Sequence, residues 1–117
     1  MGIFGNLSEK VEKQARQELS GILPEGEEIE NIYIVKEDFC AFTPKRVVFV
    51  DKKLISSRKT VTSIMYNKIN FVALKRGGTF SISKEVVIGT SGANLEIDTW
   101  DSKQAYEIMQ KISSRLT

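Results

Sequence analysis

The sequence contains no histidine and a single cysteine, and these two shortages exclude much familiar catalytic chemistry. Without histidine, the chain cannot form a Ser-His-Asp or Cys-His arrangement, and it lacks a common ligand of transition metals. With Cys40 alone, neither an internal disulfide bond nor a cysteine-based zinc site can form. Cys40 lies in an apolar stretch, which indicates a small buried hydrophobic residue. We therefore expect no enzyme activity, no catalytic residues, no bound metal and no cofactor.

Long apolar runs and an N-terminal targeting signal are also missing. No stretch approaches the roughly 20 apolar residues that a membrane-spanning helix needs. The first residues lack the charged start and long apolar core of a secretory signal. Asn6 stands where a myristoylation motif has serine or threonine. The sequence therefore gives no indication of a membrane-spanning helix or a secretory signal, and peripheral membrane association remains an alternative.

The composition is that of one soluble globular domain, but the charge is unevenly distributed. The chain has 117 residues, of which 41% are apolar and 27% charged, and a net charge of +2. Residues 1–30 carry a net charge of −4, residues 31–76 carry +7, and residues 77–117 carry −1. The basic middle segment could bind phosphate or lipid, or it could meet the acidic flank of a neighbouring copy. Both alternatives remain open at this point.

The apolar spacing predicts an amphipathic helix near each end of the chain. In residues 7–23 an apolar residue recurs every fourth position, Asn6 or Ser8 can cap the helix, and Pro24 ends it. The polar face carries both acids and bases, which favours packing on the domain or on a sister subunit over a membrane surface. The second helix follows a cap at Asp101 or Ser102. Its apolar face comprises Ala105, Ile108, Met109, Ile112 and Leu116, and Trp100 is expected to wedge beneath it.

Short β-strands separated by turns are predicted between the two helices. The stretch 42–51 is the most informative, because Pro44 presets a turn and the continuous apolar run 47–50 is typical of a strand buried on both faces. Strands are predicted at 29–35, 39–43, 47–50, 59–65, 69–74, 85–88 and 93–97, with a bulge at 77–78 and an extended piece at 79–83. Seven strands at about ten-residue spacing, followed by a helix, favour a mainly β (α+β) fold built as a meander that closes on itself.

Several short motifs carry a resemblance to a known family. They are Phe42-Thr43, Lys45-Arg46, Phe49 to Lys52, Ser63-Ile64, Tyr66, Ile69, Gly78, Phe80 and Glu85. With the seven strands and the final helix, the chain resembles the bacterial pleckstrin homology (PH) domain family over nearly its whole length. Pro44, where the family usually has Asn, is a change that a turn tolerates. Ser81 and Ser83 replace the usual Asp, which puts any acidic function of that segment in doubt.

The resemblance implies a domain organisation and an assembly. It implies one PH-like domain over 1–117, with a helical extension at 1–26, a partly open seven-stranded antiparallel barrel at 27–100 and a capping helix at 101–117. It also implies assembly into closed homo-oligomeric rings, such as pentamers, in the cytoplasm. The family has no established catalytic residues to carry over to this chain.

The basic turns around the third strand are the candidate anion or lipid contacts. They contain Lys45, Arg46, Lys52, Lys53, Arg58 and Lys59. A phosphate or an anionic bilayer could bind them, but these side chains could equally be solvated turn residues, with Arg46 paired to an acid. The first hairpin loop, 36–38, is short and net acidic, which argues against a specific phosphoinositide site. Nucleic acid is not an expected partner, because no aromatic residues are interleaved with the bases.

The leading functional hypothesis is a non-enzymatic, homo-oligomeric scaffold or interaction module. Its partner would be a peptide or protein that adds a strand to a sheet edge or binds beside the C-terminal helix. The candidate contacts between copies are Ile3, Phe4, Leu7 and Val11. The alternative is a peripheral membrane module that binds anionic lipid through the basic turns of residues 45–59.

Overall fold

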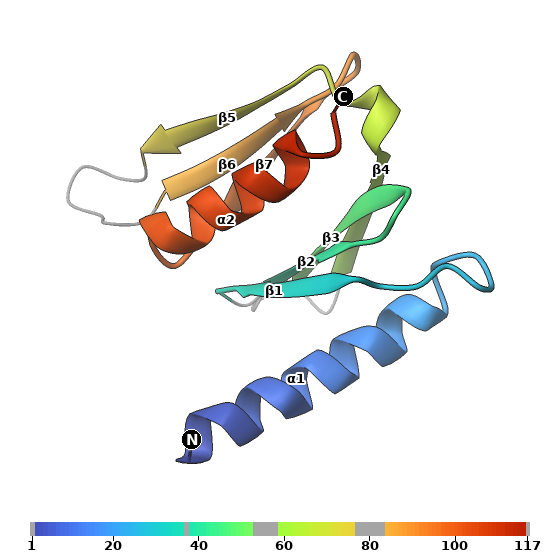
Figure 1. Ribbon diagram of the computed structural model, residues 1–117, viewed down its shortest axis with the longest axis vertical. Helices are drawn as coiled ribbons and strands as arrows, with labels where there is room; N and C mark the ends of the chain where they lie inside the picture. Colours follow the sequence, from blue (N-terminus) through green and yellow to red (C-terminus); the bar gives the residue numbers. More distant parts are fainter. Residues whose placement is uncertain (1, 37, 53–58, 77–83, 117) are drawn as a thin grey trace.

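Two antiparallel sheets and two terminal helices make up the chain (Figure 1). The computed structural model describes residues 2–36, 38–52, 59–76 and 84–116. In chain order the elements are α1 (Gly2–Ser20), β1 (Asn31–Val35), β2 (Asp38–Phe42), β3 (Arg46–Lys52), β4 (Lys59–Met65), the 3₁₀ helix η1 (Tyr66–Lys68), β5 (Phe71–Arg76), β6 (Lys84–Gly89), β7 (Asn94–Asp98) and α2 (Ser102–Ser113). The predicted extended piece at 79–83 and the bulge at 77–78 lie outside the described residues.

The strands form a partly open barrel. The first sheet has the order β1-β2-β3-β4 and the second the order β5-β6-β7, with antiparallel pairing throughout. No ladder joins β4 to β5 in the part of the chain that the structure describes. Figure 1 shows α2 lying between the two sheets and α1 lying under the first sheet. The mainly β fold with a capping helix and an extra N-terminal helix, predicted from the sequence, is confirmed.

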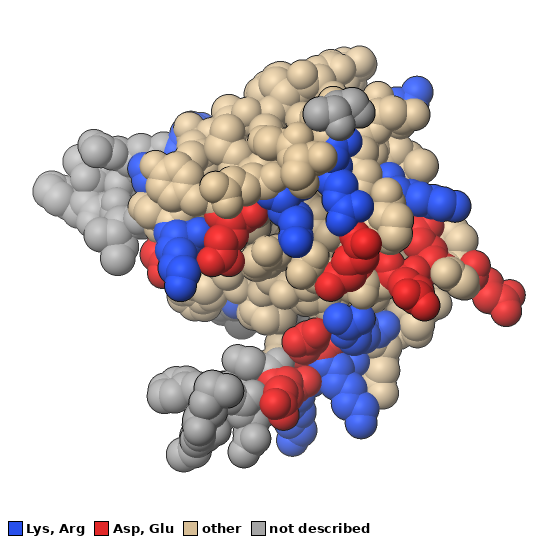
Figure 2. Space-filling model, in the orientation of Figure 1, with Lys and Arg blue, Asp and Glu red and all other residues tan. Residues whose placement is uncertain are grey.

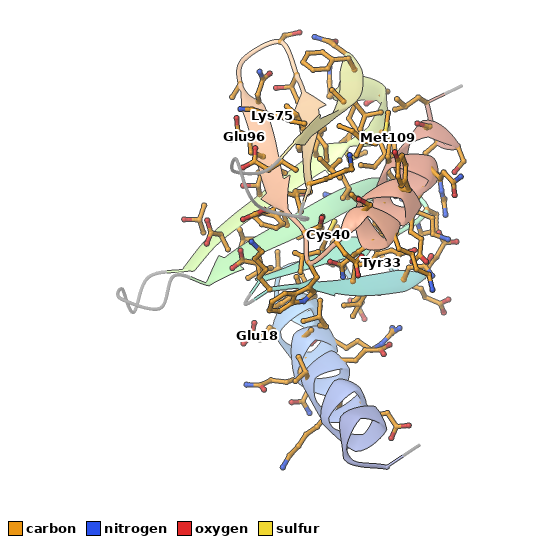
Figure 3. The ribbon with its side chains drawn as sticks, turned by 90° about the vertical axis from the view of Figure 1, so that its left-hand side faces the viewer. Glu18, Tyr33, Cys40, Lys75, Glu96 and Met109 are labelled. Atoms are coloured by element: carbon orange, nitrogen blue, oxygen red, sulfur yellow. The ribbon has the colours of Figure 1, made fainter. Side chains whose placement is uncertain are left out.

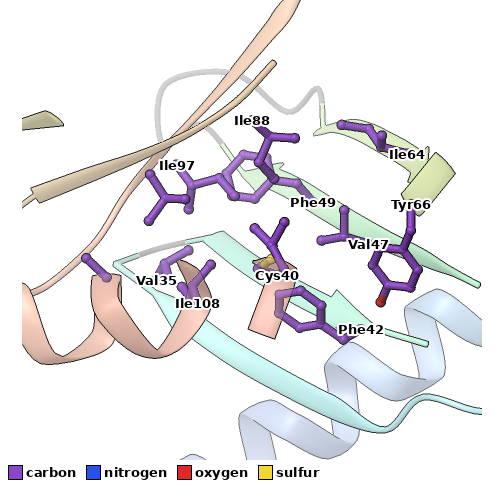
Figure 4. Close-up of a cluster of buried hydrophobic side chains, with 13 residues drawn as sticks. Val35, Cys40, Phe42, Val47, Phe49, Ile64, Tyr66, Ile88, Ile97 and Ile108 are labelled. Carbon is purple, nitrogen blue, oxygen red and sulfur yellow. The ribbon is translucent and has the colours of Figure 1, made fainter. Parts of the chain in front are cut away.

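The main core fills the space between the two sheets and α2 (Figure 4). Successive side chains of a strand point to opposite faces of the sheet, so a strand contributes every second side chain to this core. From α2 the main core receives Ala105, Ile108 and Ile112 of the predicted apolar face, and Leu116 packs against it, whereas Met109 is not part of it. Its buried members are Val35, Cys40, Phe42, Val47, Phe49, Ile64, Tyr66, Val86, Ile88, Ile97, Ala105, Ile108 and Ile112.

A second cluster, the outer core, lies between α1 and the outer face of the first sheet. Its α1-side residues Ala15, Leu19 and Leu23 are four positions apart and face the sheet together. They pack against Phe39, Ala41, Val48 and Val50, which point away from the main core. β2 and β3 are therefore covered on both sides. The prediction that the run 47–50 is buried on both faces is confirmed, with every residue at most 5% exposed.

Cys40 lies in the main core and is fully buried. Burial raises the pKa of its thiol to about 12. The thiol therefore stays protonated at neutral pH and is sheltered from reagents. The interpretation of Cys40 as a small buried hydrophobic residue is confirmed.

The limits of α1 differ from the sequence prediction. α1 begins at Gly2 rather than at residue 7, so Asn6 and Ser8 lie within it and do not cap it. The apolar four-residue spacing extends back to Ile3 without an intervening proline, and the helix follows it. At the other end, the backbone N–H groups of Ile22 and Leu23 both donate to Leu19 O at 2.9 Å, which closes the last turn before residue 23.

Trp100 is the second departure from expectation, because it is 55% exposed and does not wedge beneath α2. The capping turn accounts for its position. Asp101 caps α2 by accepting a hydrogen bond from Gln104 N at 2.9 Å, and Gln104 Oε1 in turn accepts one from Trp100 N at 3.0 Å. Ala105 and Ile108 fill the space under the first turns of the helix, which leaves Trp100 at the surface.

An aromatic ring covers a glycine on the outer face of the second sheet. Phe71 on β5 lies directly opposite Gly89 on β6. A Cβ atom at Gly89 would lie only 2.0 Å from Cε1 of Phe71, so the ring occupies the space that the missing side chain leaves. On the same face, Lys75 lies 3.8 Å from Glu96 and 4.0 Å from Glu85 (Figure 3).

The outer core makes a direct prediction for stability. Replacing the fully buried Leu19 with alanine is expected to lower the free energy of unfolding by about 3 kcal/mol, because a cavity opens between α1 and the sheet. Ile22, just beyond the end of α1, is 45% exposed, and its replacement with alanine serves as the control, with an expected loss under about 1 kcal/mol. Urea unfolding followed by circular dichroism measures both. Equal losses would show that α1 does not pack on the sheet as described.

Candidate functional site

The turn between β2 and β3 is short and strongly organised. Pro44 and Lys45 occupy its tip, and Thr43 N donates to Arg46 O at 2.9 Å to close it. The side-chain oxygen Oγ1 of Thr43 accepts hydrogen bonds from the backbone N–H groups of Lys45, at 3.1 Å, and Arg46, at 3.0 Å. A threonine hydroxyl that accepts such bonds stabilises a tight turn. The turn that Pro44 predicted is therefore present, and it fixes where Lys45 and Arg46 lie.

A partly buried ion pair joins this turn to the segment between α1 and β1. Arg46 donates from Nε and Nη2 to the two carboxylate oxygens of Glu27 at 2.8 and 3.0 Å, and Thr43 Oγ1 donates to the same carboxylate at 2.8 Å. The Glu27 side chain is only 5% exposed. Burial alone would raise the pKa of Glu27, but the hydrogen bonds from Thr43 and Arg46 and the charge of Arg46 lower it below the ordinary 4.5. Glu27 is therefore ionised and bound from two sides.

The same turn is tied to the C-terminal end of the chain. Tyr66 Oη donates to the backbone oxygen of Thr43 at 2.7 Å, and the Arg115 guanidinium lies 5.6 Å from the centre of the Tyr66 ring. Arg115 also forms an ion pair with Glu30, just before β1. Burial raises the pKa of Tyr66 to about 12, so its hydroxyl remains a hydrogen-bond donor at neutral pH. These contacts make the turn a rigid part of the surface.

Two pockets lie on either side of Pro44 and Lys45. One has a volume of about 350 Å³ and is lined by Pro24, Glu25, Gly26, Glu27, Glu28, Pro44 and Lys45. The other has a volume of about 430 Å³ and is lined by Pro44, Lys45, Met65, Tyr66, Asn67, Arg115 and Leu116. Acidic groups dominate the first pocket. The second contains two cations, one of which is already paired with Glu30.

The structure places only part of the predicted basic site. Lys45 is exposed, whereas Arg46 is committed to Glu27. The side chains of Lys52 and Lys59, and the whole of Lys53 and Arg58, lie outside the described residues. On the face that Figure 2 shows, acidic and basic side chains are intermixed and no single basic patch is formed. Among the residues described, no group of three or more acidic or cysteine side chains is arranged to hold a metal ion.

The predicted contacts between copies lie on the N-terminal half of α1. The side chains of Ile3, Phe4 and Leu7 are outside the described part of the structure. Val11 is half-buried and does not belong to the outer core. Figures 1 and 3 show that α1 moves away from the first sheet toward its N-terminus. The contact between α1 and the sheet is therefore made by the C-terminal half of the helix.

In the described part of the structure, β4 forms a free edge of the first sheet, a feature that the strand pattern alone did not identify. Within the described ranges, β4 pairs with β3 and with no other strand. Tyr66 N donates to Lys45 O at 3.3 Å, so this pair is hydrogen-bonded. In an antiparallel ladder, hydrogen-bonded and non-hydrogen-bonded pairs alternate. The residues that direct their backbone N–H and C=O groups away from β3 are therefore Val61, Ser63 and Met65.

In the part of the chain that the structure describes, this edge has less protection than the other edges. Charged residues and covering side chains normally keep an edge strand from pairing with another chain. β5 carries Lys75 and Arg76, and β7 carries Glu96 and Asp98. The backbone oxygen of Ile34 at the edge of β1 accepts a hydrogen bond from Gln104 Nε2 of α2 at 2.7 Å. By contrast, the one charged residue of β4 is Lys59 at its start, and residues 60–65 contain no charge, no proline and no glycine. Val61 and Met65 are 37% and 38% exposed.

A small apolar groove lies beside β4 on the inner side. It has a volume of about 200 Å³. Its lining residues come from β4, the turn between β6 and β7, and the start of β7: Thr62, Ile64, Thr90, Ala93, Asn94 and Leu95. Free backbone groups, exposed apolar side chains and an open groove thus occur together at this edge. An edge of this kind is suited to accept an added strand.

A partly open seven-stranded barrel and a helix that covers its opening define a pleckstrin homology fold. Solved structures agree with this class. The pleckstrin homology domain of Shewanella amazonensis superimposes with a TM-score of 0.71 over 90% of this chain and 87% of that chain, at 24% identity. A DUF1696 family protein with a pleckstrin-homology domain from Shewanella loihica gives 0.64 over 90% and 92%, at 23% identity.

Sequence comparison identifies the family. The model of the family described as Bacterial PH domain matches residues 1–116, and the chain belongs to this family. It is 37% identical over 95 residues to the uncharacterized protein YjqA of Bacillus subtilis. This match covers 80% of this chain and 76% of YjqA. It is 28% identical over 116 residues to the uncharacterized protein YozO of the same organism, covering 99% and 98%. The resemblance noted from the sequence motifs is confirmed.

The Glu27–Arg46 pair predicts a pH dependence of stability. Replacing Glu27 with glutamine is expected to cost about 2 kcal/mol at pH 7, because Arg46 loses its charged partner in a partly buried site. The pKa of Glu27 is lowered by folding, so its contribution is present above its unfolded pKa and is lost as the pH falls through the folded pKa. The difference from wild type should therefore shrink in acid.

Chemical denaturation at pH 7 and at pH values below 4.5 measures this difference. Glu12→Gln is the matched control, because Glu12 pairs with Arg16 at 3.1 Å on the exposed face of α1, and its loss should cost less than about 1 kcal/mol. If the Glu27 variant is as stable as the Glu12 variant at pH 7, the Glu27–Arg46 pair does not stabilise the fold as described.

Proposed function

We propose that this bacterial PH domain is a non-enzymatic, homo-oligomeric interaction module that binds an extended protein segment at the free edge of β4. The observation that carries the proposal is the uncharged run of residues 60–65, which within the described residues has no strand on its outer side and lies beside an open apolar groove. A long apolar edge is an aggregation hazard that proteins normally block. Its retention here supports the view that another chain covers it.

Strand addition at β4 would use the backbone and both faces of the sheet. The N–H and C=O groups of Val61, Ser63 and Met65 would provide main-chain hydrogen bonds, each contributing about 1 kcal/mol net. Successive side chains of the added strand would alternate between the two faces. One set would enter the groove lined by Ile64 and Leu95, and the other would lie beside Val61 and Met65. Main-chain bonds would give affinity, and the two sets of side-chain contacts would give selectivity.

Self-association is supported by α1 and by the distribution of charge. The apolar stripe of α1 continues beyond the outer core through Val11 toward Leu7, Phe4 and Ile3. A second copy covering this stripe would bury it. The net charge of −4 over residues 1–30 and of +7 over residues 31–76 would attract one copy to the next. A contact between two different surfaces of this kind generates a closed ring when the rotation from one copy to the next divides a full turn evenly. A pentamer is one such ring.

The groups that could act as nucleophiles support a binding role over a catalytic one. The Cys40 thiol and the Tyr66 hydroxyl are buried, and burial raises the pKa of each to about 12. Both groups would stay protonated at neutral pH, and Tyr66 Oη already donates to Thr43 O. Within the described part of the chain, no cluster of side chains that could hold a metal ion supplies an alternative.

The lipid-binding alternative depends on the basic turns and now centres on Lys45. This lysine is exposed between the two pockets, whereas Arg46 is engaged by Glu27. Sedimentation with phosphatidylserine vesicles at low salt tests the alternative, since binding through Lys45 should weaken with added salt and in Lys45→Glu. Absence of wild-type binding at low salt would exclude it.

The absolute mass in solution tests the homo-oligomer. Light scattering after size exclusion is expected to give a multiple of the 13.2 kDa chain mass, stable on dilution. Leu7→Asp and Phe4→Asp should each lower the mass, because a carboxylate would be buried in the contact along α1. Lys10→Asp, on the exposed face of the same helix, is the control and should keep the wild-type mass. A wild-type mass of 13.2 kDa would rule out the homo-oligomer, and unchanged masses for both variants would rule out the α1 contact.

A further inference from the structure

We infer that the segment received by the β4 edge is β4 of a second copy, paired antiparallel about a two-fold axis at Ser63. This inference rests on the proposed function, which makes the β4 edge a docking site, and it names the occupant. An isologous contact needs a surface that complements itself. Residues 60–65 complement themselves in their backbone hydrogen-bonding groups, in their side chains on both faces of the sheet and in their charge.

The backbone groups allow the pairing. Val61, Ser63 and Met65 direct their N–H and C=O groups to the free side of β4, as the alternation from the Tyr66–Lys45 bond requires. With the axis at Ser63, Ser63 of one copy lies opposite Ser63 of the other, and Val61 lies opposite Met65. Each of these is a hydrogen-bonded pair, so all six free backbone groups of each copy find a partner. The first sheets of the two copies would then join into one sheet of eight strands.

The side chains match in this register on both faces. Residues directly opposite each other in an antiparallel pair lie on the same face of the sheet. On the outer face, the exposed Val61 meets the exposed Met65 of the second copy, twice by symmetry. On the inner face, Thr62 meets Ile64. The second copy's Ile64 therefore reaches the groove beside Thr62, Ala93 and Leu95, whose volume of about 200 Å³ is otherwise open.

The neighbouring registers match less well. With the axis at Thr62, Val61 lies opposite Ser63, and Met65 lies opposite the charged Lys59. With the axis at Ile64, Met65 lies opposite Ser63, and Val61 lies opposite Asn67, which belongs to η1 rather than to a strand. The axis at Ser63 alone among these three pairs the two exposed apolar side chains with each other.

The charge pattern also favours a second copy over a charged peptide. Residues 60–65 contain neither acids nor bases, so two copies of this segment can meet without opposing like charges. The other edge strands carry charges or are covered, with Lys75 on β5, Glu96 on β7, and Gln104 over β1. Only at β4, within the described residues, does the edge offer an uncharged surface that could pair with its own copy.

Site-specific cross-linking tests the register directly. The native Cys40 is fully buried, so a single introduced cysteine reports on its own position. In the Ser63→Cys variant the two thiols belong to directly opposed residues, with Cα atoms about 5.5 Å apart. In the control, Val61→Cys, the cysteine lies on the same strand and the same face. The Cα atoms of the two cysteines would be roughly 14 Å apart, because they are offset by four residues along the paired strands.

A short bifunctional thiol reagent is expected to produce a species of twice the 13.2 kDa chain mass from Ser63→Cys. It should form about ten times faster than from Val61→Cys, because the opposed thiols have a high effective concentration. Equal yields from the two variants, or no cross-linked dimer, would overturn the pairing about Ser63. Circular dichroism of both variants confirms that they are folded.

A charged variant separates this inference from the proposed function. Val61→Lys places a cation opposite Met65 of the second copy and should halve the mass measured by light scattering, since a lysine protects an edge strand. Halving together with selective cross-linking of Ser63→Cys supports the inference. Halving without selective cross-linking overturns the register at Ser63 but leaves β4 as a docking edge. An oligomeric wild type whose mass Val61→Lys leaves unchanged overturns the β4 contact, and a monomeric wild type overturns the homo-oligomer itself.

Discussion

The packing of α1 on the outer face of the first sheet is the contact on which the rest of the structure depends. It covers Phe39, Ala41, Val48 and Val50, which would otherwise form an exposed apolar surface on β2 and β3. Because both faces of these strands are buried, the runs 39–42 and 47–50 can be apolar without interruption, and they form the centre of the structure. The outer core draws its strand residues from β1, β2 and β3, and the outward-facing apolar residues of β4 lie beyond it. α1 thus leaves the outer face of β4 uncovered, while the order of the strands makes β4 an edge of the sheet.

Much of the fold could be predicted because local patterns encode it. The continuous run 47–50 indicated two-sided burial before any partner for its outer face was known, and the structure supplies that partner in α1. The cap at Asp101 and the apolar face of α2 follow from short-range spacing. The sequence predicted two alternative roles for Arg46, a contact to an anion or one half of an ion pair. In the structure Arg46 is paired with an acid.

The remaining features depend on contacts that sequence spacing does not reveal. Glu27 is 19 residues from Arg46, and only the path of the chain between α1 and β1 brings the two together. Likewise, Arg115 meets Glu30 across 85 residues. The free edge of β4 is a property of the order of strands in the sheet, and several orders are compatible with the same strand pattern. Local patterns therefore predicted the elements, whereas the candidate site required the topology.

The ring of Phe71 over Gly89 has a spectroscopic consequence. Ring atoms of Phe71 lie 2.0 to 2.4 Å from the point where a Cβ of Gly89 would be, so one α-proton of this glycine points at the aromatic ring. The circulating π electrons of the ring create a local magnetic field there, which moves the resonance of that proton away from those of other glycines. A single displaced glycine signal would therefore report that β5 and β6 are in register, in solution and without any label.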